Sequence, residues 1–221
     1  MSALPSTPVM TRDIALLFCR VCSWAYQAWV THKYLFDQND KQTDTIEKAI
    51  PFFNRLATIT QEYSLQQIAK LHDPAKQKDD LNVSVNFVVR FGEWGDKEAE
   101  IKAIEARLLK LWRYLKPARH KLLAHNDLKA LLANEVLGGF PEGEDDLYFT
   151  ALQELVNEVH ARWVDSGPYP FDDLAINDVF EFLHVLERNQ SISERPHSFA
   201  PWSFSSLNIA ADSAWPCGWG S

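Results

Sequence analysis

The segment from Arg119 to Asp127 contains the residue types that can cleave RNA without a metal ion. Such cleavage needs one group to take the proton of the 2′-hydroxyl and another to protonate the leaving 5′-oxygen. Histidine suits both roles because its pKa lies near neutrality, and His125 is the candidate. A cation must also offset the charge that builds on the phosphate, and the forked guanidinium of Arg119 suits that role. Residue types alone favour a plainer interpretation, with Arg119 a surface charge and His125 a hydrogen-bonded core histidine.

This segment lies within a basic stretch of an acidic protein. The 221 residues carry a net charge of −8, but residues 102–129 contain eight basic and two acidic side chains. That stretch is therefore +6 and the remainder is −14, so only this part of the surface could attract nucleic acid electrostatically. We expect Lys110, Arg113 and Lys116 to contact RNA. Charge alone is equally consistent with a solvated basic face balanced by acidic neighbours.

The composition indicates a globular protein of a reducing compartment. Hydrophobic residues make up 46% of the chain, enough for a sizeable core. No apolar run reaches the roughly 18 residues that a membrane span needs, and the N-terminus lacks the features of a secretory signal. An odd number of cysteines, 3 in all, argues against a disulfide framework. We expect a cytoplasmic protein with no membrane partner.

The elements that must position the segment from Arg119 to Asp127 are expected to be helices along almost the whole chain. Apolar periodicity and helix breakers predict helices over 11–36, 44–72, 96–125, 145–164 and 171–186. Asp73 and Pro74 end the second of these. Residues 81–91 are rich in β-branched side chains, but a single strand would have no partner, so we predict a short helix. The expected fold class is all-α, a helical bundle.

The helix that begins at Asp96 carries the motif at its end. Its apolar residues recur at spacings of three and four: Ile101, Ile104, Leu108, Leu111 and Leu115. The same register continues through Ala118 and Leu122 to His125, which places His125 on this apolar seam with Arg119 beside it. Pro117 is expected to bend the helix just before Arg119. The long seam predicts a homodimer that packs along residues 101–125.

Two other patterns suggest metal or redox chemistry, but both are incomplete. Cys19 and Cys22 form a CxxC pair without a second pair, which favours buried small side chains over a zinc or redox site. Glu181 and His184 form an ExxH pair, whereas a di-iron bundle needs two such pairs and further carboxylates. Neither pattern predicts a site.

A third pattern is the doublet His72-Asp73, of the kind seen in metal-dependent phosphohydrolases. It stands directly before Pro74, where aspartate is more often a turn former. The sequence also lacks a phosphate-binding glycine loop and a GxSxG motif. We therefore expect neither a metal site nor a cofactor.

The motif resembles the signature of the HEPN superfamily, an Arg followed four to six positions later by a His, often with a polar residue after the Arg. The longer pattern is similar to the abortive-infection U-type branch of HEPN proteins, Arg-polar-Lys…Ala-His-x-Asp. The matching residues are Arg119, His120, Lys121, Ala124, His125 and Asp127. The upstream run Leu71-His72-Asp73-Pro74 is similar to the Leu-x-Asp-Pro of that branch. The likeness covers roughly residues 10 to 190.

The resemblance implies a HEPN-like bundle and a homodimer that brings two motifs together. It also implies metal-independent endoribonuclease activity in phage defence, by abortive infection or in a toxin–antitoxin system with an antitoxin protein as partner. Arg119 and His125 would be the catalytic residues. The supporting residues would be His120, Lys121, Asn126 and Asp127. Two alternatives stay open: a non-catalytic HEPN module that binds RNA, a nucleotide or a partner protein, and an unrelated helical enzyme or scaffold.

The chain is expected to divide into three segments. Residues 1–10 form an N-terminal arm, 11–188 the helical domain and 189–221 a tail. The tail is rich in Ser and Pro, and its aromatic residues follow no period. We expect it to be irregular or disordered and to contribute little to stability, unless its tryptophans dock on a helix.

Overall fold

A computed structural model of the chain describes residues 9–37, 50–119 and 139–188. Several predictions fall outside these ranges. They concern residues 1–8, the first turns of the helix predicted over 44–72, the tail 189–221, and residues 120–138, which include the motif from His120 to Asp127. The prediction that the helix from Asp96 continues to His125 lies there too.

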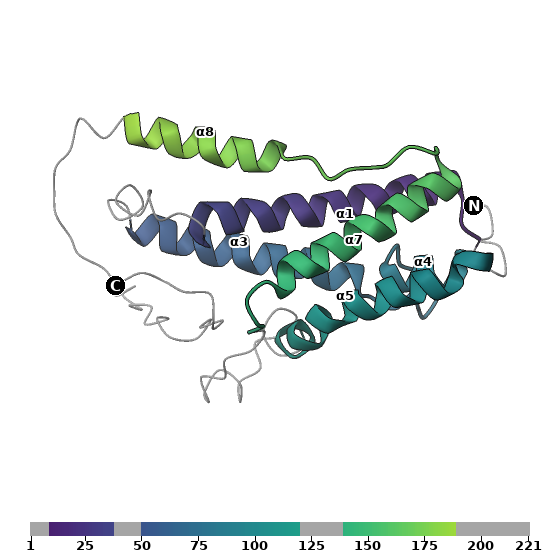
Figure 1. Cartoon of the computed structure of the whole chain (residues 1–221). Helices are drawn as coiled ribbons and strands as arrows, with labels where there is room; N and C mark the ends of the chain where they lie inside the picture. The colour runs from purple at the N-terminus through teal and green to yellow at the C-terminus, as the bar shows by residue number, and fades with distance from the viewer. Residues whose placement is uncertain (1–8, 38–49, 120–138, 189–221) are drawn as a thin grey trace.

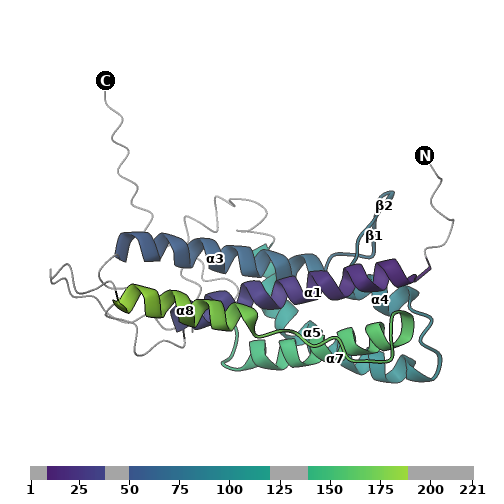
Figure 2. The ribbon, with the colours of Figure 1, turned by 90° about the horizontal axis from the view of Figure 1, so that it is seen from above.

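The described chain is built from long helices packed side by side, as the sequence predicts. Helix α1 (Arg12–His32) lies against α3 (Ile50–Leu71) and α7 (Glu144–Trp163), and α7 packs on α5 (Glu98–Ala118). Figures 1 and 2 show α8 (Leu174–Arg188) along the outer side of α1, at the end opposite the short helix α4 (Val85–Phe91). No helix among the described residues has the length and apolarity required to cross a membrane.

Helix α1 begins one residue after the predicted start at Thr11 and buries one apolar stripe. The hydroxyl of Thr11 accepts a hydrogen bond of 3.3 Å from the N–H of Ile14, which caps the helix. Cys19 and Cys22 lie in the buried stripe, and burial raises the pKa of the Cys19 thiol to about 11. A buried thiol with a raised pKa is a poor nucleophile and metal ligand, so both cysteines are core residues, as predicted. A π-helical turn (Lys33–Asp37) follows α1.

The connection between α3 and α4 differs from the prediction in one respect. Helix α3 ends at Leu71, just before Asp73-Pro74, but the next residues form a small antiparallel hairpin of β1 (Lys76–Gln77) and β2 (Asp80–Leu81). The prediction of a helix from Leu81 is therefore wrong for its first residues and confirmed from Val85 onward. Two-residue strands are too short to show an alternating pattern in the sequence.

Helix α5 buries the seam that the sequence predicts. A 3₁₀ turn (Gly95–Lys97) leads into it. Its buried side chains are Ile101, Ile104, Leu108, Leu111, Trp112, Leu115 and Ala118. The seam packs within the chain, where α7 supplies fully buried side chains such as Leu152 and Leu155. The prediction that this seam forms the homodimer interface is therefore wrong. A spacing of three and four residues specifies an apolar face, and that face is the same whether the helix it meets belongs to this chain or to a second copy.

Polar contacts join the start of α7 to α1 and to the π-helical turn that follows it. Gly143 adopts a φ of 80°, which favours glycine, directly before the helix. The carboxylate of Asp145 accepts from the indole N–H of Trp29 at 3.0 Å and from the ammonium of Lys33 at 2.7 Å. These contacts fix the first turn of α7 on the bundle, and Tyr148 lies one turn further along.

Candidate functional site

Arg119 belongs to the part of the predicted motif that the structure describes. It follows α5 directly, with a φ of −53° and a ψ of −48°, and its N–H donates to the carbonyls of Leu115 and Lys116. Pro117 lies within α5 and does not end the helix. The chain is therefore still helical at Arg119, as the sequence predicts.

The guanidinium of Arg119 is held by a carboxylate that is distant in the sequence. Its Nη2 donates to Oδ1 of Asp73, just beyond the end of α3. The side chains of Arg119 and Asp73 are 32% and 23% exposed, so the salt bridge is only partly shielded from water. One nitrogen makes this contact, and the other donors of the guanidinium form no hydrogen bond with a described residue. The structure thus joins the Leu71–Pro74 run to the motif, a contact that sequence reasoning did not predict.

The other half of the His72-Asp73 doublet faces the interior. His72 Nε2 lies 3.0 Å from the hydroxyl of Tyr148, and its ring stacks on Trp112 with centroids 4.9 Å apart and planes at 7°. Burial lowers the pKa of His72 to about 3, so the imidazole is neutral at physiological pH. Both side chains of the doublet are therefore engaged with this protein's own residues. Among the described residues, no group of three or more His, Cys, Asp or Glu side chains could hold a metal ion.

The three residues predicted to contact RNA are all exposed on the second half of α5: Lys110, Arg113 and Lys116. They recur every third residue of α5, so each is rotated about 60° around the helix from the next, and Lys116, one turn before Arg119, is the nearest of the three to it along the chain. None of the three forms a salt bridge with another described residue. Their positive charge is therefore available to a ligand within the described surface.

A cavity of 260 Å³ lies beside the salt bridge, between α5, α4 and the chain that follows α3. Its walls include His72, Val85, Asn86, Glu105, Leu109 and Trp112. Burial raises the pKa of the Glu105 carboxyl, an effect that the nearby Lys102 partly offsets. Sequence reasoning missed this cavity. A signal was present in the spacing of Glu105, Leu109, Trp112, Lys116 and Arg119, a second helical stripe beside the apolar seam.

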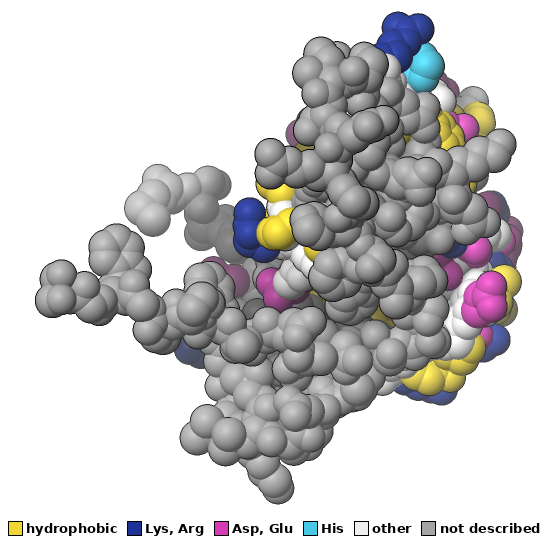
Figure 3. Space-filling view, turned by 90° about the vertical axis from the view of Figure 1, so that its left-hand side faces the viewer, with side chains coloured by type: hydrophobic (Ala, Val, Ile, Leu, Met, Phe, Trp, Pro, Cys, Tyr) yellow, Lys and Arg dark blue, Asp and Glu magenta, His cyan; other side chains and the backbone are white. Residues whose placement is uncertain are grey.

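The exposed side chains at one end of the bundle are of mixed charge. The end-on view in Figure 3 shows basic and acidic side chains together with hydrophobic ones on the described surface. This face is therefore not a uniformly basic surface in its described part.

An all-α bundle with an arginine at the end of a long helix, six residues before a histidine, defines a HEPN-type module. The family model of the HEPN AbiU2 proteins matches residues 13–185, and the chain belongs to this family. The match runs from α1 to α8 and so includes both Asp73 and Arg119. No curated protein and no solved structure matches the chain.

Proposed function

We propose that this HEPN protein is a metal-independent endoribonuclease. It would act in the cytoplasm in phage defence, through abortive infection or as the toxin of a toxin–antitoxin pair with an antitoxin protein as partner. The observation that carries the proposal is the position of Arg119, which Asp73 holds directly after the half of α5 that carries the exposed cations Lys110, Arg113 and Lys116. Those cations would attract the RNA backbone, and the guanidinium would receive one phosphate.

The salt bridge with Asp73 favours a positioned arginine. A free arginine side chain loses rotamer entropy when it binds a phosphate, whereas one that is already held loses less. The carboxylate of Asp73 also offsets part of the guanidinium charge, and Lys116, one turn before Arg119, would supply further positive charge. Asp73 is therefore a positioning residue in this proposal.

The proton transfers would come from two subunits. Each motif supplies one His125, and cleavage needs both a base and an acid, so a homodimer would place a His125 on each side of one scissile phosphate. One imidazole takes the proton of the 2′-hydroxyl as the 2′-oxygen attacks phosphorus. The other protonates the 5′-oxygen as its bond to phosphorus breaks. The supporting residues would be His120, Lys121, Asn126 and Asp127. The products are a 2′,3′-cyclic phosphate and a 5′-hydroxyl.

The test is cleavage of a defined single-stranded RNA by the full-length protein in EDTA, with the product ends identified. We expect activity to persist in EDTA with a bell-shaped pH profile near neutrality. His125→Ala should lower the rate about a hundredfold or more, and Arg119→Ala by a comparable amount. Arg107→Ala is the matched control, because it removes an arginine about 18 Å away along the same helix. Cleavage that requires a divalent metal would overturn the proposal.

The second candidate is a non-catalytic module that binds RNA, a nucleotide or a partner protein. The engagement of Arg119 by Asp73 favours it, since a guanidinium already paired with a carboxylate has less charge to offer a transition state. In that case the wild-type protein binds RNA with the expected salt dependence but cleaves none, and His125→Ala leaves binding unchanged.

A further inference from the structure

The cavity beside Asp73 has the size and the walls of a site for one planar ring. Its 260 Å³ lies just below the roughly 300 Å³ at which sites for drug-sized ligands begin. Trp112, stacked on His72, gives it an aromatic wall, and Leu109 and Val85 add apolar side chains. Aromatic and apolar walls of this kind receive nucleobases in proteins that bind single-stranded RNA.

Two polar side chains in the walls are left with hydrogen-bonding capacity. The Oδ1 atom of Asn86 accepts from the N–H of Ala75 at 3.0 Å, which fixes the amide. Its Nδ2 group has no acceptor among the described residues and stays a donor. The carboxylate of Glu105 forms no salt bridge with a described residue and stays a double acceptor. A partly buried carboxylate without a paired cation is costly unless a ligand supplies donors.

The carboxylate of Glu105 and the amide NH₂ of Asn86 together favour one of the four bases, guanine. Guanine carries two adjacent donors on its Watson–Crick edge, N1–H and N2–H, and next to them the acceptor O6. The two oxygens of a carboxylate can accept both donors, and an amide NH₂ can donate to O6. Adenine, cytosine and uracil each carry a single donor group on that edge beside an acceptor. If one of these three bases entered the cavity, an acceptor atom of the base would face an oxygen of Glu105 with no proton between them, which disfavours binding.

The cavity also adjoins the proposed phosphate site. Asp73, which holds Arg119, lies between His72 and Pro74, and both of these residues line the cavity. Along α5, Lys116 lies one turn beyond Trp112 in the direction of Arg119. A base in the cavity would therefore have its phosphate beside the cations.

We propose that this cavity binds a guanine base through Glu105 and Asn86, with the attached phosphate directed toward Lys116 and Arg119. Its role as a specificity site in RNA cleavage rests on the proposed function, whereas base binding itself can be measured without cleavage. If both hold, the enzyme cleaves next to guanosine.

The experiment is calorimetric titration of the full-length protein with GMP, AMP, CMP and UMP at one ionic strength. These ligands share the phosphate and differ in the base. We expect GMP to bind about tenfold or more tightly than the others, the scale on which one bidentate contact distinguishes bases. Glu105→Gln should remove the preference for GMP, because it changes only the pair of acceptor oxygens. The affinities for AMP, CMP and UMP should stay within about twofold of their wild-type values.

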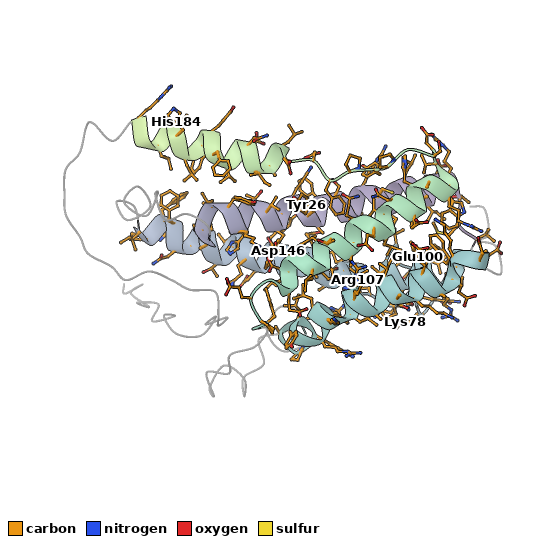
Figure 4. The ribbon with its side chains drawn as sticks, viewed as in Figure 1. Tyr26, Lys78, Glu100, Arg107, Asp146 and His184 are labelled. Carbon is orange, nitrogen blue, oxygen red and sulfur yellow. The ribbon has the colours of Figure 1, made fainter. Side chains whose placement is uncertain are left out.

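Two further variants sharpen the test. Asn86→Asp keeps an acceptor for the Ala75 N–H but replaces the donor to O6, so GMP affinity should also fall about tenfold. Glu100→Gln is the matched control: it removes the same charge from an exposed position on the same helix, away from the cavity walls, and should change nothing (Figure 4). Helicity and melting temperature confirm that each variant is folded.

Each outcome decides the proposal. Equal affinity for the four nucleotides, or no effect of either cavity variant, would show that only the phosphate is bound and would overturn it. Absence of binding would overturn it as well. Selective GMP binding by a protein that cleaves no RNA would leave the guanine site standing and reject the ribonuclease.

Discussion

The two halves of α5 and its approach both carry several basic side chains but differ in their acidic residues and in what their charges do. In the first half, Lys102 pairs with Glu98 at 2.5 Å, Arg107 (labelled in Figure 4) pairs with Glu154 on α7 at 2.6 Å, and Lys97 pairs with Glu158. In the second half, the exposed cations have no salt-bridge partner among the described residues, and Arg119 is held by Asp73.

This difference separates charge that is neutralised from charge that is available. Exposed salt bridges contribute about 0–1 kcal/mol to stability, so the pairs of the first half matter less for folding than for the electrostatic potential. They leave that half of the helix nearly neutral toward a polyanion. A ligand with phosphates would therefore be drawn to the second half, although both halves contain several lysines and arginines.

The largest expected effect concerns the seam, which both halves of α5 share. Leu108 is fully buried, so Leu108→Asp would place an unpaired charge in the core and should cost more than about 3 kcal/mol, enough to unfold the protein. Lys110→Asp, on the exposed side of the same helix, should leave the fold intact. Circular dichroism and thermal melting would measure both. A folded Leu108→Asp protein of lower mass would show that the seam joins two subunits after all.

The second prediction tests the comparison directly. Replacing Lys110, Arg113 and Lys116 by Ala should weaken RNA binding about tenfold or more and lower the slope of log K against log salt by about 2. The matched triple variant replaces Lys97, Lys102 and Arg107 and should leave affinity within about twofold. Fluorescence anisotropy with a labelled single-stranded RNA at several salt concentrations measures both. Equal losses in the two variants would remove the distinction between the halves.

The third prediction separates the roles of Asp73. Asp73→Asn removes a negative charge but keeps an oxygen that can accept from Arg119. RNA affinity should therefore rise severalfold, whereas kcat should fall about tenfold because the guanidinium is less firmly positioned. Single-turnover kinetics distinguish the two effects. A fall in affinity with kcat unchanged would show that Asp73 does not position Arg119.

The fourth prediction is a pH dependence of stability that arises from His72. Its pKa is about 3 in the folded protein against 6.5 as the ordinary value, so the unfolded state binds the proton first. Stability is therefore lost as the pH falls below 6.5 and levels off below 3, by about 2 kcal/mol between pH 7 and pH 5. His72→Gln should reduce that loss, while buried His32, whose pKa is lowered to about 4, still contributes. Urea unfolding at the two pH values provides the measurement, and a loss unchanged in the variant would contradict it.

The sequence by itself determined the helices and their buried faces. The periodicity of Ile101 to Leu115 and the stop at Asp73-Pro74 both rest on interactions between residues a few positions apart, which local patterns record. The same reasoning identified the basic segment and the HEPN motif. It missed the hairpin over residues 76–81, because its strands are too short to carry a period.

Only the tertiary structure decided what each face meets. The seam of α5 faces α7 of the same chain, although its spacing would suit a second copy equally well. Arg119 meets a carboxylate that lies 46 positions away along the chain, and Trp112 meets His72 rather than solvent. Which of the cations are neutralised depended on where α7 placed Glu154 and Glu158. The physical reason is common to all of these: a local pattern specifies which side of a helix is apolar or charged, whereas the path of the whole chain specifies its partner.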